Sequence, residues 1–268
     1  MNKLIALPCY NRPEYLVQCL SHLMKCDGIK EYEIFVSIDP SDKLNTIINL
    51  LETAKKNLNL RYYINNVKIG CNANIEQVLT WCMREPVNSV VYVEDDICLA
   101  PDTLRMFEFM EKEYYHDSDV YAGCAYSRAN PNEHEYFEIE KRKSFMPWGV
   151  IFFNGERWAR TKYLWFDLYN PPVIIKREKD GKPVEEVYEY LSWDYFTKWT
   201  IRGDKSCVFP KLSRSKNIGE VGCHTPSREW HKKKHTLDKW AGDGYITIEG
   251  EFHTGSKVLE HGIQGQRI

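Results

Sequence analysis

Apolar and polar positions alternate in blocks along the N-terminal part of the chain. Short apolar runs of strand length are separated by longer segments in which apolar residues recur at the spacing of a helix with one buried face. Strands are predicted at 3–7, 33–38, 60–64 and 90–93, and helices at 14–24, 46–58 and 75–83. Because strands that alternate with helices form βαβ units, we expect a mostly parallel sheet flanked by helices on both faces.

The alternation weakens in the rest of the chain. A helix is predicted at 101–115, a strand at 120–125 and another helix at 185–202, whereas the polar segment 130–143 is predicted to be a loop. The tail from Pro226 onward is polar and contains glycine. Since no internal repeat or low-complexity linker marks a second domain, we expect a single α/β domain with a C-terminal extension.

Composition narrows the class of protein. A chain of 268 residues fits one large domain, and its formal net charge of -2 excludes a protein coated with positive charge. No apolar stretch approaches the length of a membrane span or of an export signal. The nine cysteines contain no CxxC pair, which favours reduced thiols over a disulfide framework or a zinc site. We therefore expect a cytoplasmic protein without a membrane span.

Three acidic residues, Glu94-Asp95-Asp96, directly follow the predicted strand at 90–93. In parallel sheets, ligands bind outside the carboxyl ends of the strands, which is where this triplet falls. Adjacent carboxylates repel one another unless a cation neutralises them, and Mg²⁺ and Mn²⁺ prefer oxygen ligands and bridge to phosphates. The alternative is an acidic turn in which Asp96 or Asp102 caps the next helix. The position after an apolar strand favours a Mn²⁺ or Mg²⁺ site.

Several short segments resemble one known family when they are taken in their order along residues 4–225. They are Leu4 to Pro13, Asp39, residues 66–74 with Gly70, the acidic triplet, Pro147-Trp148-Gly149, and Lys216-Asn217-Ile218-Gly219 followed by His224. Together they resemble the GT-A fold nucleotide-sugar glycosyltransferases. The triplet resembles their DxD motif, in the Glu-Asp-Asp form of N-acetylglucosaminyltransferase I-like enzymes, and the later segments are similar to the PWGW and KNIG stretches of bacterial sugar transferases.

The resemblance implies a fold and a reaction. The fold would be a single GT-A-like (Rossmann-like) domain, with a nucleotide-sugar half at 1–96, an acceptor and catalytic half at 97–225, and a C-terminal extension or lid at 226–268. The reaction would be the metal-dependent transfer of a sugar from a nucleoside diphosphate sugar to an acceptor hydroxyl, with inversion. A UDP-sugar is the commonest donor for this resemblance.

The resemblance also implies donor-site roles, residue by residue. Pro8, Asn11 and Arg12 would border the base and ribose, and Asp39 would accept a hydrogen bond from one of them. The two amides after Gly70 would hold the nucleotide or the triplet loop, and the first two acids of the triplet would lie towards the ribose and sugar. These residues are Asn72, Asn74, Glu94 and Asp95.

The same resemblance implies a metal shell and a sugar-binding loop. Asp96 would be the chief metal ligand, and His224 would complete the shell as a late histidine; a surface or core role is the alternative for His224. Trp148 could stack on the face of a pyranose, or simply pack. Gly149 would let the backbone approach the sugars closely.

Inverting transfer needs a base that takes the proton of the attacking hydroxyl. The segment from Leu191 to Phe196 resembles the family segment in which an Asp lies at a helix start near the acceptor. This makes Asp194 the candidate base and Trp193 a substrate contact. The alternative for Asp194 is a helix N-terminal residue stabilised by the dipole, and Glu186 and Glu189 are the fallback bases.

The segment 202–239 is basic, with ten Lys or Arg against four acidic residues. Such a run is usually a solvated face. Arg228 and Lys232 to Lys234 could instead close over the diphosphate leaving group, whose negative charge grows as the glycosidic bond breaks. The run also contains aromatic residues, and it could hold an anionic acceptor such as nucleic acid.

The sequence leaves the acceptor open. A glycan or polysaccharide is the expected acceptor for a bacterial-type enzyme, and a hydroxymethylated base in DNA, which some phages glycosylate, is the alternative. Two further classes are a nucleotidyltransferase and a non-catalytic sugar-binding module. The first is disfavoured because the loop at 8–13 has no glycine, and the second because the triplet and Asp194 are both intact.

Overall fold

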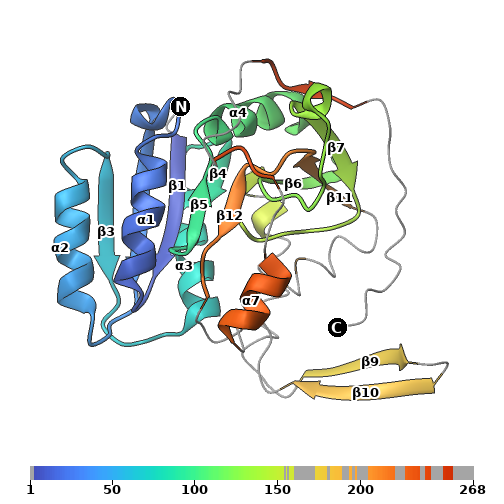
Figure 1. The fold of residues 1–268 in the computed structure, drawn as a ribbon. Coiled ribbons are helices and arrows are strands. Elements are labelled where there is room, and N and C mark those ends of the chain that lie inside the picture. The colour runs from blue at the N-terminus through green and yellow to red at the C-terminus, as the bar shows by residue number, and fades with distance from the viewer. Residues whose placement is uncertain are drawn as a thin grey trace.

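The structure is a computed structural model. It describes residues 3–153, 155, 157–159, 173–179, 182–188, 193–194, 197, 205–220, 227–235, 239–242 and 250–255. In this part of the chain, one large mixed sheet with helices on both faces forms the body of the protein (Figure 1). The α/β fold expected from the sequence is therefore confirmed.

The large sheet has nine strands in the order β13-β7-β11-β6-β8-β4-β1-β2-β3. Their bounds are β1 Lys3–Cys9, β2 Tyr32–Ile38, β3 Leu60–Ile64, β4 Ser89–Tyr92, β6 Val120–Cys124, β7 Glu138–Arg142, β8 Val150–Phe153, β11 Ser206–Pro210 and β13 His253–Thr254. Strands β3, β2, β1 and β4 run parallel, whereas β8 runs antiparallel between β4 and β6. The parallel block contains the four strands predicted in the N-terminal part of the chain.

The described residues also form two small antiparallel sheets of two strands each. In the first, β5 (Ile97–Leu99) pairs with β12 (Ser215–Asn217). In the second, β9 (Val173–Lys179) pairs with β10 (Lys182–Tyr188). The first of these matters for function, because it follows the acidic triplet directly.

The first four long helices divide between the two faces of the large sheet, whereas the last one lies at its end (Figure 1). The helices are α1 Pro13–Leu23, α2 Leu44–Ala54, α3 Cys71–Arg84, α4 Thr103–Tyr114 and α7 Arg228–His235, with short 3-10 helices at Ile29–Glu31 and Glu133–Glu135. Alternate residues of β1 point to opposite faces. Ile5 and Leu7 join a buried core with residues of α1, α2 and α4, whereas Leu4 and Ala6 join a second core with residues of α3.

Two predicted segments differ in the structure. The first is 130–143, predicted to be a loop, which contains β7. The loop was predicted because the segment is polar, but its charged residues are paired rather than solvated. Lys141 contacts Asp117, and Arg142 contacts Glu140, which is 4% exposed. A strand whose charges have such partners shows no apolar alternation.

The second difference is the helix predicted at 185–202, whose first four residues lie in β10. The predictive signal was present: Asp180-Gly181 separates two runs of strand length, and this dipeptide is typical of a two-residue hairpin turn. The fallback base Glu186 therefore belongs to a hairpin strand, whereas Glu189 lies outside the described residues.

Two further expectations concern the cysteines and membrane-spanning helices. Eight cysteines lie in the described ranges, where no disulfide joins any two of them, and seven of the eight are buried. None of the helices in these ranges combines the length and the apolar character that crossing a bilayer demands.

Candidate active site

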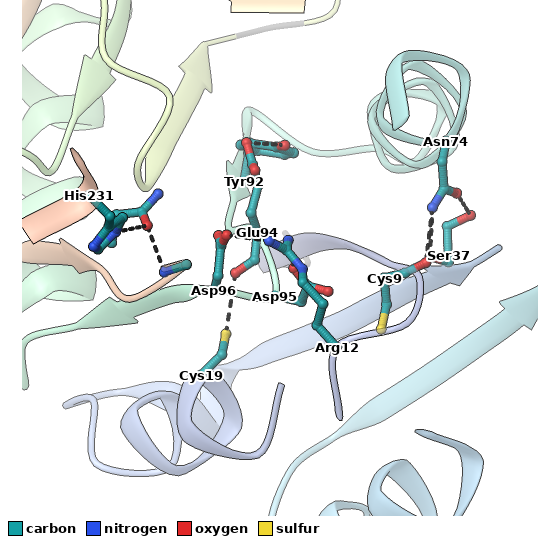
Figure 2. Close-up of polar contacts among 12 residues, drawn as sticks. Cys9, Arg12, Cys19, Ser37, Asn74, Tyr92, Glu94, Asp95, Asp96 and His231 are labelled. Atoms are coloured by element: carbon teal, nitrogen blue, oxygen red, sulfur yellow. Dashed lines mark hydrogen bonds and ion pairs between the residues drawn. The ribbon is translucent and has the colours of Figure 1, made fainter. Parts of the chain in front are cut away.

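The carboxyl ends of β2, β1 and β4 meet at one edge of the sheet, because these strands are parallel neighbours. Three loops leave the sheet there, and they carry Arg12, Asp39 and the triplet Glu94-Asp95-Asp96. In Figure 2, the Arg12 side chain points from the loop after β1 towards the triplet in the loop after β4. The edge of the sheet at which a ligand was expected thus brings charged side chains from separate loops together.

The backbone of the triplet is held on both sides. Before it, the Val93 amide donates to the Ala6 carbonyl at 3.0 Å and extends the pairing of β4 with β1. After it, β5 pairs with β12, and the Ile218 amide donates to the Asp96 carbonyl at 2.9 Å. The segment from Lys216 to Gly219, far away in sequence, therefore lies beside the triplet.

A buried ion pair supports this arrangement. Arg214 is 0% exposed, and its Nε donates to both carboxylate oxygens of Asp102 at 2.9 and 3.1 Å. Asp102 occupies the N-cap position of α4 but makes no side-chain cap hydrogen bond, and Asp96 precedes β5 rather than this helix. The helix-cap alternative is therefore wrong for Asp96, whereas Asp102 is the N-cap residue of α4 but uses its side chain to bind Arg214.

Arg12 lies against the last two carboxylates of the triplet. Its Nη1 donates to Asp96 Oδ2 at 2.7 Å, and its Nη2 pairs with Asp95 Oδ1. The two aspartates are only 3% and 5% exposed, so one guanidinium neutralises carboxylates that water reaches poorly. The sequence predicts Arg12 beside the base and ribose, and it gives no sign of this contact with the triplet.

Burial makes ionisation of the triplet costly. Desolvation, followed by repulsion from Asp96, raises the pKa of Glu94 to about 8. Desolvation also raises the pKa of Asp95 to about 6, although Arg12 opposes this shift. Tyr92 donates its hydroxyl to Glu94 Oε1 at 2.9 Å. The single charge of Arg12 does not offset the cost of ionising these carboxyls, and a divalent cation would supply further positive charge.

Asp96 has the surroundings that best fit a metal ligand. Its Oδ1 is buried and has no hydrogen-bond partner in the described part of the chain, whereas buried carboxylate oxygens are normally paired. Its Oδ2 is enclosed by Arg12 and by Gly219, where an added Cβ would come within 2.2 Å of it. Oδ2 is thus fixed, whereas Oδ1 is available as an oxygen ligand of the kind that Mn²⁺ or Mg²⁺ prefers.

Metal affinity is expected to rise with pH. Because the pKa values of Asp95 and Glu94 are raised to about 6 and about 8, both carboxyls must lose protons before the triplet can hold a divalent cation. The apparent affinity for Mn²⁺ should increase across this range, by up to roughly tenfold per pH unit for each proton released. Calorimetric titration with Mn²⁺ in buffers of different ionisation enthalpy measures both the affinity and the number of protons released on binding.

The metal-free protein should show the opposite trend in stability. The folded-state pKa of Glu94 lies above its ordinary value of 4.5, so the folded chain binds this proton more tightly than the unfolded chain. Its contribution to stability is present at low pH and is lost as the pH rises from about 4.5 to about 8. Melting temperatures in chelator should show this loss in the wild type and less of it in Glu94→Gln; the same slope in both proteins would contradict the assignment.

The histidine predicted to complete the metal shell, His224, lies outside the described residues. The structure instead brings His231 of α7 near the triplet, with its Nε2 3.2 Å from Asn217 Oδ1. The same oxygen accepts the Gly219 amide at 2.8 Å. His231 is 7% exposed; burial lowers its pKa, whereas the charges of Glu220 and Asp96 oppose that shift. In the sequence, His231 is one aromatic residue of a basic run, and nothing in the pattern singles it out.

The described residues alone do not assemble three or more His, Cys, Asp or Glu side chains into a metal cluster. Mg²⁺-type ions are commonly held by one or two carboxylates together with the phosphates of the substrate.

Asp39 is 2% exposed, and both of its carboxylate oxygens accept hydrogen bonds. Oδ1 accepts from Asn65 Nδ2 at 2.8 Å and from the Ile69 amide at 3.3 Å, and Oδ2 accepts from the Gly70 amide at 2.8 Å. These bonds fix the turn before α3, which begins at Cys71 after a glycine with φ of 88°, earlier than predicted. The expected hydrogen bond between Asp39 and the base or ribose stays a prediction.

Two amides of α3 connect separate parts of the site. Asn74 accepts from Ser37 Oγ at 2.5 Å and donates to the carbonyls of Ser37 and Cys9 at 3.1 and 3.3 Å, so it joins the ends of β1 and β2 (Figure 2). Asn72 Oδ1 accepts the Trp193 amide at 3.1 Å. Their contact with a nucleotide remains untested.

The candidate base lies next to a core residue. Trp193 is 2% exposed, and its ring centroid lies 5.0 Å from that of Tyr92 and 5.5 Å from that of Phe145. This ring packs in the core, and its contact with the substrate stays a prediction. Asp194 follows on a helical turn and is partly exposed. Because Tyr92 also contacts Glu94, the same core supports the triplet and the segment that carries Asp194.

The loop before β8 packs under β12. Trp148 is 9% exposed, its ring meets Tyr126 edge-on at 4.2 Å, and its carbonyl accepts Ser215 Oγ at 2.5 Å. Gly149 has φ of 80°, and an added Cβ would lie 3.0 Å from Leu99 Cδ2. Glycine is therefore required here for packing, whether or not Trp148 also contacts a sugar.

The other residues predicted to contact the donor differ in their exposure to solvent. Pro8 is buried within β1 opposite Ser37, and Asn11 is exposed at the carboxyl edge of the sheet. Arg228 is exposed on α7, with its Nε 3.7 Å from Glu220 Oε2. Figure 1 shows α7 at the end of the sheet where the parallel strands finish.

Comparison with known proteins identifies the family of the chain and solved structures with a similar fold. The family model described as "Glycosyl transferase family 2" matches residues 4–181. No curated protein matches the chain in sequence. S. aureus TarS, in a structure of its residues 1–349, is 17% identical, with a TM-score of 0.50 over 80% of this chain and 60% of that chain. The chain thus spans about 60% of that structure's length.

Two further solved structures have lower TM-scores. The mannosyltransferase PcManGT from Pyrobaculum calidifontis, in complex with GDP-Man and Mn²⁺, is 17% identical, with a TM-score of 0.42 over 64% of this chain and 47% of that chain. The glycosyltransferase GlyE from Streptococcus pneumoniae is 9% identical, with a TM-score of 0.42 over 77% of this chain and 45% of that chain. Similarity at these identities concerns the fold alone.

Proposed function

The chain is a glycosyltransferase that belongs to glycosyl transferase family 2, and from this premise we propose how its site works. The proposed reaction moves a sugar from a nucleoside diphosphate sugar to an acceptor hydroxyl, with Mn²⁺ or Mg²⁺ at the triplet. One observation carries the proposal: at the carboxyl edge of the sheet, Asp96 Oδ1 is buried without a partner among the residues that the structure describes, while Oδ2 is fixed by Arg12. A cation that also binds the donor diphosphate fits this place.

The metal, when bound, supplies positive charge that stabilises the diphosphate as the bond to the sugar breaks. Asp96 would hold it, and Glu94 and Asp95 would shape the loop and lie towards the ribose and sugar. The other donor residues keep their predicted places, with Pro8, Asn11 and Asp39 near the base and ribose. The donor half would be residues 1–96, and α7, within the C-terminal extension 226–268, would border the diphosphate with Arg228.

Asp194 would take the proton of the attacking hydroxyl. Two contacts support its position: the Trp193 amide donates to Asn72 Oδ1, and the Trp193 ring packs on Tyr92, whose hydroxyl reaches Glu94. These contacts fix the start of the Asp194 turn relative to the donor half. A base on the acceptor side would give inversion in a single displacement. Trp148 and Gly149 would lie under the sugars, His224 near the metal, and a glycan would be the acceptor.

The proposal is tested first by ligand-dependent stability. Nucleoside diphosphates (UDP, GDP, ADP and CDP) are added to the protein with and without Mn²⁺, and the melting temperature is recorded. One diphosphate, UDP by expectation, should raise it by roughly 5 °C near saturation and only when Mn²⁺ is present. No shift with any nucleotide and metal would oppose the proposal.

Product analysis separates the alternatives. A glycosyltransferase releases a nucleoside diphosphate from the sugar donor, whereas a nucleotidyltransferase releases pyrophosphate from a nucleoside triphosphate. Slow hydrolysis of the donor without acceptor should already yield the diphosphate. Adding glycans or hydroxymethylated DNA to the same assay then shows which acceptor accelerates its release.

A further inference from the structure

The Arg12 side chain forms the exposed face of the anionic centre. Its exposed fraction is 26%, compared with 4% for the side chain of Asp95 and 8% for that of Asp96. An ion or ligand that approaches these two carboxylates therefore meets the guanidinium first. Its two nitrogens hold one oxygen of each aspartate, so the pairing uses the forked geometry of arginine.

The backbone of Arg12 is fixed, whereas its side chain is half-buried and ends beside a second favourable group, the ring of Tyr15. The Arg12 carbonyl accepts the amides of Tyr15 and Leu16 at 3.1 Å at the start of α1, where Pro13 sets the first turn. The guanidinium also lies 5.6 Å from the centroid of the Tyr15 ring. Movement is thus confined to the side-chain torsions, and the charge can leave the carboxylates without disturbing β1 or α1.

A divalent cation at Asp96 and the guanidinium of Arg12 would compete for the same carboxylates. Two cations within a few ångström of each other repel strongly where water is scarce. A diphosphate changes this balance, because it brings negative charge and an oxygen geometry that a guanidinium binds in bidentate fashion. The carboxylates could then be left to the metal, and Arg12 would face the phosphates.

We propose that Arg12 exchanges partners: it neutralises Asp95 and Asp96 while the site is empty, and it pairs with the donor diphosphate once metal and nucleotide are bound. This inference rests on the proposed function. It makes Arg12 a diphosphate-binding residue rather than a neighbour of the base. It also implies that metal and nucleotide bind cooperatively, since each relieves the charge conflict created by the other, and that the coupling is reciprocal.

The test is Mn²⁺ binding to the full chain, followed by the electron paramagnetic resonance signal of free Mn²⁺. Each protein is titrated alone and with saturating UDP, and the association of Mn²⁺ with UDP in buffer is measured in parallel. For the wild type we expect weak binding of Mn²⁺ alone and a gain in affinity of about tenfold or more with UDP, within the usual range of coupling between sites. Arg61→Gln, on the exposed edge strand β3, is the matched control and should behave as the wild type.

Arg12→Gln removes the charge, so Mn²⁺ alone should bind about tenfold more tightly than it does to the wild type, and UDP should add correspondingly less. Arg12→Lys keeps the charge without the fork, and its binding of Mn²⁺ alone should stay weak. The idea is overturned if Arg12→Gln binds Mn²⁺ alone no better than the wild type, or if Arg12→Lys binds it as tightly as Arg12→Gln. If the glutamine variant does not fold, Arg12→Lys tests the proposal alone. Tight binding of Mn²⁺ by Arg12→Lys would show that charge repulsion is not what weakens Mn²⁺ binding in the wild type.

The two proposals fail separately. A wild type that binds neither Mn²⁺ nor UDP with Mn²⁺ would remove the proposed function and this inference together. A wild type that binds both, with the same coupling in Arg12→Gln, would leave the glycosyltransferase site intact and remove only the exchange of partners.

Discussion

Replacing Asp96 with alanine is expected to lower metal-dependent release of nucleoside diphosphate from the donor by about a thousandfold. The variant loses both the buried Oδ1, to which no group in the described ranges donates a hydrogen bond, and the Oδ2 held by Arg12. A metal ion typically supplies several kcal/mol of charge stabilisation during such a reaction, and about 1.4 kcal/mol corresponds to a tenfold change in rate. The rate of diphosphate release is measured at saturating donor over a range of Mn²⁺ concentrations.

The fold should survive this change. Arg12 keeps its pairing with Asp95, and removal of one carboxylate lessens the repulsion that raises the pKa of Glu94. In chelator, the melting temperature of Asp96→Ala should therefore lie close to that of the wild type, whereas Mn²⁺ with UDP should no longer raise it. Asp42→Ala, at an exposed position after β2, is the matched control. Near-normal turnover in Asp96→Ala would take Asp96 out of the metal site.

Replacing Asp194 with asparagine is expected to slow sugar transfer by roughly 10² to 10⁴-fold, the usual contribution of a positioned general base. Asparagine keeps the size of the side chain but cannot accept the proton of the acceptor hydroxyl. Binding of the donor with Mn²⁺ should be unchanged, because the proposed role of Asp194 concerns only the acceptor hydroxyl. Single-turnover transfer rates and the melting-temperature shift with UDP measure the two effects separately.

Asp119→Asn, an exposed carboxylate before β6, is the control for this variant. If Asp194→Asn transfers sugar at the normal rate, the residue has only a structural role at the start of its helical turn. If transfer and donor binding fall together, the change has disturbed the contact of the Trp193 amide with Asn72 instead, and the role of base is not supported.

The parallel half of the fold could be predicted from the sequence because its periodicity is strong. The strand 60–64 agrees with β3 at both ends, and the helices around it differ only at their termini. Such elements carry a buried face on a short segment, so the pattern of a few residues is enough. The triplet was found for the same reason: three acids directly after an apolar strand are a local signal.

The rest depended on contacts between distant segments. Nothing near Arg12 in the sequence shows that it pairs with Asp95 and Asp96, and nothing near His231 shows that it reaches Asn217. The order of strands in the sheet could not be predicted either. Strand β8 lies between β4 and β6 in the sheet, although β5 and α4 separate β4 from β6 along the chain and β7 separates β6 from β8. A local pattern records which face of a segment is buried but not which segment buries it.

The insertion of β8 and β11 has a consequence for how the chain folds as it is made. Both strands fill gaps between strands that are synthesised earlier: β8 joins β4 to β6, and β11 joins β6 to β7. Until residues 206–210 have left the ribosome, β6 and β7 have open edges, and such edges invite pairing with other chains. A shortened version that stops at residue 181, where the family match ends, would keep those edges for good. Aggregation during expression is therefore expected for that version, while β11 lets the complete sheet close.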